Sequence, residues 1–584
     1  MPQHAWRLSI LLFVLGLFII TACEDTTTDT PAEVAQPRNP CPAPIDVPEN
    51  GVLVLVDSSN TKELWFTQMQ EQFNAANIAT TAGNPVRVQV WHKGSTLDTR
   101  CEPAAWSPSD QIRVEGTNQE WRDTNNNQSL ISATCPSTLS IPIGIAMWEP
   151  MARALGWPTA SIGWDDIIAL ATAPDGWGSV GHPEWGRFRY GHGHPAHSTS
   201  GRLSVVAQIF AAKGSTEPLV FDDVWAEATQ EQVGAVQTAI AHYGRIDTAL
   251  LDRMVERGPQ YLHAITNYEG NVIRWNAEHF GQREAPWNKI VLIYPEEGTF
   301  WVDHPFCVLD GAPWVTPEEA EGARLFRDFI TAPEQQAQLP ATGIRAVDPA
   351  VPLDVPGSPL TLENGVIPTL SQAEIPALPI PEADVMQNVI EMWEQVKKPS
   401  TVVLVIDTSG SMDGEPMQAA IAGAQNFLNQ MHPNDRVVVL EFNDRVLPVQ
   451  PSGLVGEVGE TLRQAIGGLS AGGGTALHAA TIEGVRVANE LRAADMANGE
   501  SRIYGVVLMT DGENTAEDGV TQEMMLNVLP DGLESDQVRL HTIGYGAGAD
   551  SNLLENLANR TNGSFSEGTI DNIDQVYFLI SSEF

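Results

Sequence analysis

The fold of the C-terminal part of this chain is indicated by the stretch Val402-Val403-Leu404-Val405-Ile406, with Asp407-Thr408-Ser409-Gly410-Ser411 directly after it. Its first five residues are apolar and mostly β-branched, which is typical of a strand buried on both faces of a parallel sheet. The oxygen-bearing side chains of Asp407, Ser409 and Ser411 follow in one short loop. Because ligands of open α/β sheets bind beyond the carboxyl ends of the strands, the stretch predicts a binding loop at the edge of a sheet.

The residues around this stretch alternate between strand and helix patterns. Further apolar runs predict strands at 436–442, 503–509 and 538–543. Helical periodicity is expected at 417–431, 458–469, 477–497, 522–529 and 551–561. This alternation predicts a doubly wound, Rossmann-like α/β domain over residues 399–584.

Two later loops of this domain carry matching chemistry. Thr475 ends the turn Gly472-Gly473-Gly474-Thr475, and Asp511 follows the strand predicted at 503–509. Hydroxyl and carboxylate oxygens suit a hard cation, so we expect Mg²⁺ first, with Mn²⁺ or Ca²⁺ as alternatives. A phosphate-binding loop is the competing interpretation, but the lysine of GxxxxGK[ST] is missing.

The Asp407-x-Ser409-x-Ser411 motif, Thr475 and Asp511 together resemble the von Willebrand factor A domain and its metal-ion-dependent adhesion site. The resemblance covers residues 399–584. It implies that Ser409, Ser411 and Thr475 offer hydroxyls to the metal, while Asp407 and Asp511 often act through water. It also implies a protein partner that completes the metal with a carboxylate.

The N-terminal body, residues 46–395, shows weaker signals of the same kind. Strands are predicted at 51–56, 86–90 and 139–147, and helices at 62–75 and 161–171, with Ser161 as a candidate N-cap. About 350 residues are too many for one core, so we expect two α/β lobes with a cleft between them.

Several segments of this body resemble the type II extracellular solute-binding proteins of ABC importers. They include Trp106-Ser107-Pro108, Ser198-Thr199-Ser200-Gly201 and Tyr268-Glu269. The complete chain resembles bacterial lipoproteins that join such a module to a C-terminal von Willebrand A domain. The resemblance implies a small-molecule or peptide ligand and candidate ligand-binding residues at loops facing the cleft: Gly94, Ser95, Ser107, Ser198, Ser200, Tyr268 and Glu269. For each of them, a capping hydroxyl or a packed side chain is the alternative.

The two ends of the N-terminal body have distinct compositions. Prolines crowd residues 340–381 and predict an extended strap. A helix is expected at 382–397, with Val389 and Trp393 on its apolar face, and the main domain boundary follows it. Residues 23–45 read as an acidic, flexible stalk.

The first residues predict export and a lipid anchor. Arg7 precedes an apolar run over residues 8–20, which is too short to span a bilayer but fits a secretory signal. The run ends in Ile20-Thr21-Ala22-Cys23, which resembles the lipobox of bacterial lipoproteins. This implies a signal peptide at 1–22, lipidation of Cys23 and an extracytoplasmic protein held to the membrane by lipid alone. An ordinary signal peptide is the alternative.

The cysteines and the charge agree with this interpretation. Apart from Cys23 there are four cysteines, which allow two disulfides in an oxidising compartment. Proximity in the sequence favours Cys101–Cys135 and leaves Cys41–Cys307. The formal net charge of −42 argues against nucleic acid as a partner.

These features favour a membrane-anchored binding protein in two parts. One part captures a solute in its cleft, and the other binds a protein partner through a metal ion. An adhesion or assembly scaffold whose cleft has lost its ligand is the alternative. Catalysis is not expected, because HExxH does not occur and Asp407 and Asp511 already serve the cation.

Overall fold

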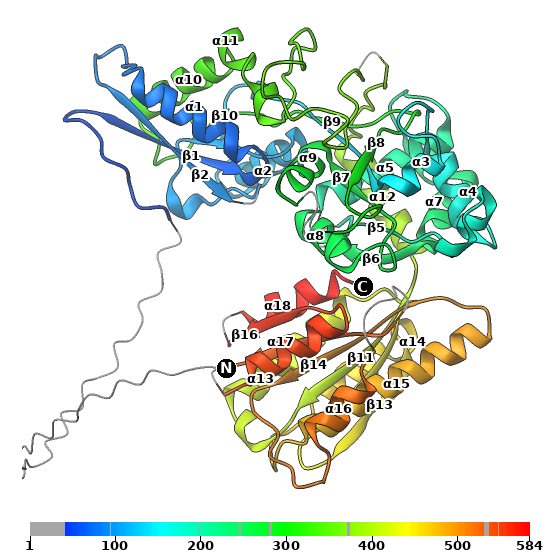
Figure 1. The fold of residues 1–584 in the computed structure, drawn as a ribbon. Helices are drawn as coiled ribbons and strands as arrows, with labels where there is room; N and C mark the ends of the chain where they lie inside the picture. Colours follow the sequence, from blue (N-terminus) through cyan, green and yellow to red (C-terminus); the bar gives the residue numbers. More distant parts are fainter. Residues whose placement is uncertain are drawn as a thin grey trace, which may run out of the picture. The chain divides into compact units, whose positions relative to one another are not determined.

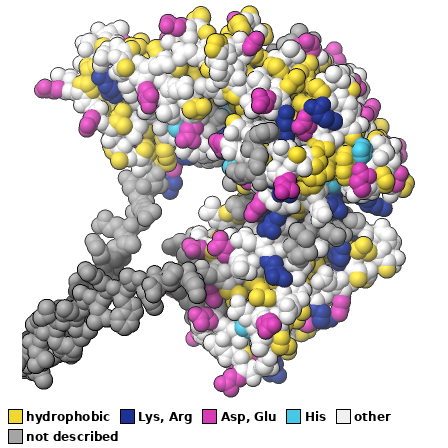
Figure 2. Space-filling view, viewed as in Figure 1, with side chains coloured by type: hydrophobic (Ala, Val, Ile, Leu, Met, Phe, Trp, Pro, Cys, Tyr) yellow, Lys and Arg dark blue, Asp and Glu magenta, His cyan; other side chains and the backbone are white. Residues whose placement is uncertain are grey.

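The computed structural model describes residues 41–584 except 94, 197, 245–246, 280–282, 371–373, 531–536, 547 and 571. The predicted signal peptide, Cys23, most of the stalk and Gly94 therefore lie outside the described residues. No helix in the part that is described has the length and apolarity needed to cross a bilayer. On the face drawn in Figure 2, acidic side chains are scattered and do not form one patch.

The C-terminal domain is built on one six-stranded sheet (Figure 1). In sheet order its strands are β13 (Val446–Leu454), β12 (Arg436–Phe442), β11 (Ser400–Asp407), β14 (Ile503–Thr510), β15 (Arg539–Tyr545) and β16 (Phe565–Gly568). All neighbours pair in parallel except β12 and β13. The four predicted strands are confirmed, whereas β13 and β16 were not predicted.

Helices cover both faces of this sheet. On one face Val402, Leu404 and Ile406 share a core with α13 (Glu415–Gln430), α14 (Val455–Ile466) and α18 (Ile573–Ser581). On the other face Val403 and Val405 share a core with α15 (Leu477–Ala497), α16 (Gln522–Val528) and α17 (Ser551–Arg560). Burial on both faces explains why the sequence of β11 is apolar without alternation.

The first lobe of the N-terminal body has a four-stranded sheet. Its order is β10 (Cys307–Val308), β3 (Ala105–Ser107), β1 (Val52–Ser59) and β2 (Val86–Lys93), with only β10 antiparallel. The helices of this lobe are α1 (Glu63–Ala75), α2 (Gln111–Thr124), α10 (Pro317–Ile330) and α11 (Pro333–Gln336). Trp65, Phe66 and Phe73 of α1 are completely buried, so the predicted amphipathic helix is confirmed.

The second lobe has a mixed sheet. Its order is β6 (Ile240–Gly244), β5 (Tyr190–Gly193), β7 (Ala264–Tyr268), β4 (Ile141–Trp148) and β8 (Ile290–Ile293), and β9 (Trp301–Val302) also pairs with β4. Its helices are α3 (Glu149–Ala154), α4 (Trp164–Thr172), α5 (Thr199–Lys213), α6 (Phe221–Val224), α7 (Glu227–Thr238), α8 (Asp247–Arg257) and α9 (Glu269–His279). The prediction that Ser161 caps α4 is wrong: Gly163 is the N-cap, and its N–H donates to the Asp166 carboxylate over 2.9 Å.

The chain crosses between the lobes three times, and the first two crossings lie side by side. The first leads from α2 to β4 and the second from β9 to β10, and Ser137 bridges to Pro305 between them. The Thr138 hydroxyl also donates to the His304 carbonyl over 2.7 Å. Paired crossings of this kind form a hinge between two lobes.

After α11 the chain crosses a third time and runs along the second lobe. Between residues 343 and 382, its described part contains neither helix nor strand, as the prolines predict. Leu360 and Val366 are nevertheless buried, so this strap packs against the body. The helix that follows, α12 (Ala383–Val396), buries Val389 and Trp393, as predicted.

The predicted disulfide pairing is wrong. Cys135 is bonded to Cys307, with 4.7 Å between their Cα atoms and 172 residues between them in the sequence. Cys41 and Cys101 each take part in a disulfide as well. Proximity in the sequence was misleading, because the second crossing brings β10 back to the first lobe and places Cys307 in the core that Cys135 joins.

One buried histidine in the second lobe is held neutral. His263 Nδ1 accepts hydrogen bonds from Trp177 Nε1 over 2.9 Å and from the backbone N–H of Arg189 over 3.1 Å. Burial, together with the charge of Arg189, lowers the pKa of His263 to about 3. A neutral ring is the form that can accept both bonds.

Candidate functional site

Asp407 lies at the carboxyl end of β11 and is completely buried. Its Oδ1 accepts a hydrogen bond from the backbone N–H of Ser409 over 2.8 Å, and its Oδ2 accepts one from Thr510 Oγ1 over 2.5 Å. Thr510 ends β14, the strand beside β11. The pairing of these two strands therefore fixes the orientation of the carboxylate.

The hydroxyl groups of the same loop meet the second aspartate. Ser409 Oγ lies 3.0 Å from Ser411 Oγ, and Ser411 Oγ donates to Asp511 Oδ1 over 2.7 Å. Ser409 is buried, whereas Ser411 is exposed. Four of the five residues predicted from the sequence thus form one connected cluster that opens to solvent at Ser411.

The glycine-rich turn carrying Thr475 is attached to this cluster. The backbone N–H of Gly410 donates to the Gly473 carbonyl over 3.0 Å, and the N–H of Gly472 donates to the Thr408 carbonyl over 2.8 Å. Gly473 has a φ of +86°, and a Cβ there would lie 2.5 Å from Asp444 Oδ2. A side chain at that position would therefore be strained and would displace the turn from Asp444, in the loop after β12.

Thr475 itself is buried and borders the loop after β14. A Cβ built on Gly512, next to Asp511, would lie 3.9 Å from Thr475 Oγ1. Thr515 of the same loop accepts a hydrogen bond from the backbone N–H of Thr475 over 2.9 Å. The three loops predicted to carry the site are therefore neighbours at one edge of the sheet.

The charges of this cluster are unbalanced. Burial, together with the negative charge of Asp511, raises the pKa of Asp407 above its usual value. Among the ion pairs of the described residues, none involves either aspartate. Two carboxylates and three hydroxyls without a basic neighbour are a donor set that fits a hard divalent cation.

No group of three His, Cys, Asp or Glu residues with metal-binding geometry occurs in the described part of the chain. This finding agrees with the composition of the cluster, in which hydroxyls outnumber carboxylates. With few anionic ligands, a bound cation keeps most of its positive charge.

Residues 401–577 match the family profile described as the von Willebrand factor type A domain. This part of the chain is a von Willebrand factor A domain. A curated relative, the uncharacterized protein sll0103 of Synechocystis, is 32% identical over 169 residues, which are 29% of this chain and 37% of that protein. The human inter-alpha-trypsin inhibitor heavy chain H2 is 24% identical over 168 residues, which are 28% of this chain and 17% of that protein. The chain thus spans little more than a third of these relatives at most.

The N-terminal body resembles solute-binding proteins in its fold. The sulfate-binding protein SubI of Mycobacterium tuberculosis covers 51% of this chain and 88% of its own, at 16% identity and a TM-score of 0.35. A putative extracellular solute-binding protein of Bordetella parapertussis covers 59% and 98%, at 11% identity and a TM-score of 0.38. The predicted α/β fold class is confirmed by the described sheets: two α/β lobes in the N-terminal body and a Rossmann-like von Willebrand A domain.

The predicted cleft residues lie at strand ends, but several are engaged within the protein. Ser95 follows β2 and is half-buried. Ser107 ends β3, is buried, and donates to the Pro305 carbonyl over 2.8 Å at the second crossing. Ser198 is the N-cap of α5 and accepts a hydrogen bond from the N–H of Gly201, and its Oγ lies 3.1 Å from Ser200 Oγ.

Tyr268 ends β7, the strand parallel to β5, Glu269 follows it, and both are buried. The Glu269 carboxylate accepts two hydrogen bonds from Arg345, both of 2.8 Å, and one from the Tyr294 hydroxyl. Burial opposes the charged form of Arg345, but the negative charge of Glu269 has the larger effect and raises the pKa of Arg345. Glu269 is therefore the anion of a buried ion pair.

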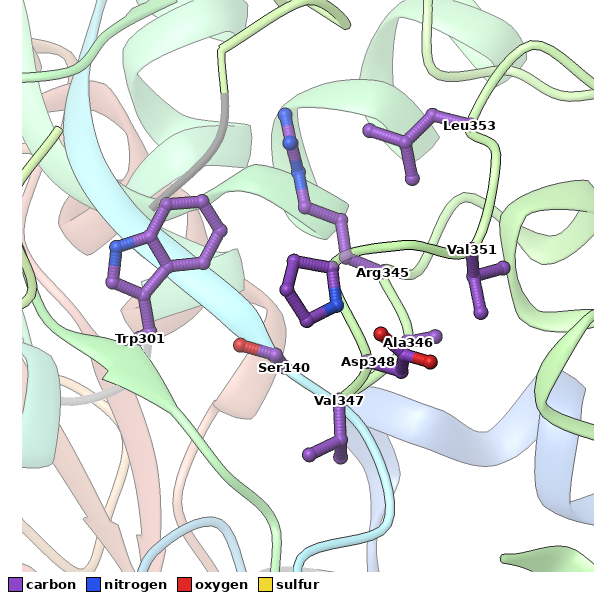
Figure 3. Close-up of a pocket in the computed structure, with 9 residues that line it drawn as sticks. Ser140, Trp301, Arg345, Ala346, Val347, Asp348, Val351 and Leu353 are labelled. Carbon is purple, nitrogen blue, oxygen red and sulfur yellow. The ribbon is translucent and has the colours of Figure 1, made fainter. Parts of the chain in front are cut away.

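A small pocket of about 40 Å³ lies beside this ion pair. Figure 3 shows Arg345 between Trp301 and the strap residues Val351 and Leu353, with Ser140 below. The guanidinium carbon lies 5.5 Å from the centre of the Trp301 ring. The pocket is too small for a solute and belongs to the packing of the strap.

The sequence did not reveal one contact across the lobes. Asp110, the N-cap of α2 in the first lobe, accepts a hydrogen bond from Thr199 Oγ1 at the start of α5 in the second lobe, over 3.2 Å. The two residues are 89 positions apart. An Asp before a helix signals only a cap, so no local pattern could have identified its second partner.

Proposed function

We propose that this chain is an extracytoplasmic two-part binding protein whose C-terminal domain binds a protein partner through a divalent cation. Mg²⁺ is the first candidate, with Mn²⁺ and Ca²⁺ as alternatives. The ligand set is Asp407, Ser409, Ser411, Thr475 and Asp511. The single observation that carries the proposal is the convergence of the three loops holding these side chains on one uncompensated pair of carboxylates.

The chain's own residues prepare this site before a cation arrives. Thr510 and the Ser409 N–H hold the Asp407 carboxylate in place. The hydroxyls of Ser409, Ser411 and Thr475 provide neutral oxygens that do not quench the charge of the ion. A bound cation supplies an electrophilic centre that a carboxylate of a partner completes, and the exposure of Ser411 leaves that side open.

We propose that the N-terminal body captures a small molecule or a peptide between its lobes. Ser95, Ser198 and Ser200 lie at the carboxyl ends of strands, where ligands of α/β folds bind. The disulfides support an oxidising, extracytoplasmic location. We further propose that lipidated Cys23 anchors the protein to the membrane.

The second candidate function is an adhesion or assembly scaffold whose cleft no longer takes a solute. One observation favours it: Glu269 and Ser107, both candidate ligand groups, have their polar atoms satisfied within the protein. Neither candidate requires catalysis, and the absence of enzymatic activity stays a prediction.

A thermal-shift experiment tests the cation proposal. The unmodified chain should be stabilised by Mg²⁺, by about 2.7 kcal/mol when the free ion is at 100 times its Kd. The double variant Ser409→Ala/Ser411→Ala should lose this stabilisation, because it keeps the carboxylates but removes two neutral ligands. Ser581→Ala is the matched control, since its hydroxyl only donates to the Phe578 carbonyl of its own helix. An equal Mg²⁺ response in the double variant and the control would refute the assignment.

A further inference from the structure

The Asp110 carboxylate sits in a set of neutral hydrogen-bond donors that come from both lobes. Its Oδ1 accepts the backbone N–H of Arg113 over 2.9 Å, which caps α2. Its Oδ2 accepts the hydroxyl of Ser109 over 2.9 Å and that of Thr199 over 3.2 Å. Only the donor from Thr199 belongs to the second lobe.

This carboxylate is desolvated and forms no ion pair, although the buried Lys62 of its own lobe interacts with it electrostatically. Asp110 is 3% exposed, and no ion pair within the described ranges includes it. A buried carboxylate that loses one of its donors is costly, more so than a neutral group would be. Breaking the hydrogen bond from Thr199 to Asp110 is therefore unfavourable in the folded chain.

The second lobe attracts this negative charge by two further features. Thr199 is the first residue of the 15-residue helix α5, whose amino end carries partial positive charge. Arg202, in the first turn of the same helix, interacts electrostatically with Asp110. Its guanidinium is held in place by the carbonyls of Pro195, over 3.1 Å, and Ala196, over 3.4 Å.

We infer that Asp110 and Thr199 form a latch that holds the two lobes together. The inference goes beyond solute capture, since it names a contact of the chain itself that joins the lobes. A solute that binds beside Asp110 and Thr199 must either break their hydrogen bond or add hydrogen bonds of its own to these two residues. Because the carboxylate already occupies the amino end of α5, the latch also disfavours an anionic solute there.

The experiment measures the separation of the lobes in the full chain without added solute. Spin labels are placed at two exposed positions, Glu71 on α1 and Glu227 on α7, and their distance distribution is recorded by pulsed electron resonance. Thr199→Val removes the donor and keeps the shape. We expect the population with the longer distance to increase about tenfold, because a hydrogen bond to a charged group contributes that much. Thr199→Ser should restore the original distribution.

Thr238→Val is the matched control, because its hydroxyl donates to the Ala235 carbonyl at the exposed end of α7 and touches no other lobe. A distribution for Thr199→Val that overlays the control overturns the latch. If Thr199→Val does not fold, Asp110→Asn provides the same readout: the charge is lost while the volume is kept. An unchanged distribution in that variant also overturns the inference. The Mg²⁺ response of the C-terminal domain is independent of either result.

Discussion

The buried ion pair between Glu269 and Arg345 provides the most quantitative test of how the N-terminal body is built. Glu269 is 1% exposed and Arg345 is 4% exposed. Besides its two bonds to Glu269, Arg345 donates to the carbonyls of Leu370, over 2.6 Å, and Ile367, over 3.3 Å. The ion pair therefore fastens the strap to the end of β7.

Glu269→Ala leaves the guanidinium buried without its anion, which typically costs 3–5 kcal/mol, so we expect a loss of about 4 kcal/mol in the free energy of unfolding. Replacing both residues, as Glu269→Leu/Arg345→Met, should recover part of that loss, because no unpaired charge remains. Glu149→Ala is the control. It breaks a surface pair with Arg153, in which the arginine is 55% exposed, and a 3.8 Å pair with Lys289; surface pairs contribute about 0–1 kcal/mol each.

Urea unfolding followed by tryptophan fluorescence is a suitable assay. All sixteen tryptophans precede the C-terminal domain, and all but Trp6 lie in the N-terminal body, so the signal does not report on the C-terminal domain. A loss below about 1 kcal/mol for Glu269→Ala, equal to that of Glu149→Ala, would refute the reasoning. It would mean that Glu269 is a free ligand group and that the ion pair is dispensable.

Three further predictions concern other parts of the chain. The folded-state pKa of His263 is about 3, below the unfolded value of about 6.5. The contribution of the neutral ring to the free energy of unfolding is therefore complete above pH 6.5 and is lost as the pH falls toward 3, by about 1.4 kcal/mol per pH unit. His263→Asn should flatten this pH dependence in urea titrations, and an unchanged slope would contradict the assignment. Cys135→Ser/Cys307→Ser should lower stability by up to about 5 kcal/mol, because the bridge closes a span of 172 residues; a melting temperature unaffected by the change would contradict it. Gly473→Ala should weaken Mg²⁺ binding at least tenfold in calorimetry by forcing the turn off Asp444, and unchanged affinity would show that this turn does not position Thr475.

The C-terminal domain was predictable because its signals are local. The buried strand Ser400–Asp407 carries its binding residues directly after it, so the sequence order alone places them at the edge of the sheet. Strand β13 was missed because Pro448 and Pro451 interrupt it, and prolines are tolerated only because it is the edge strand. Neither fact can be recognised without knowing the strand order.

The N-terminal site was less predictable because its contacts are made across the fold. Ser198 and Glu269 were found by their positions after strands, but whether a side chain faces a cleft or another residue depends on distant segments. Arg345 reaches Glu269 from 76 residues away, and Thr199 reaches Asp110 from 89. The Cys135–Cys307 bridge was not predicted for the same reason. Between these cysteines the chain crosses to the second lobe and back, so residues 172 positions apart in the sequence are neighbours in space.

Anomalous diffraction from crystals of the full chain grown with Mn²⁺ tests the central claim most directly. The account predicts one strong peak at the edge of the C-terminal sheet, bounded by the hydroxyls of Ser409 and Ser411 and by the Asp511 carboxylate. The absence of a peak there at saturating Mn²⁺, or a peak elsewhere with these three side chains still bonded to one another, would contradict it.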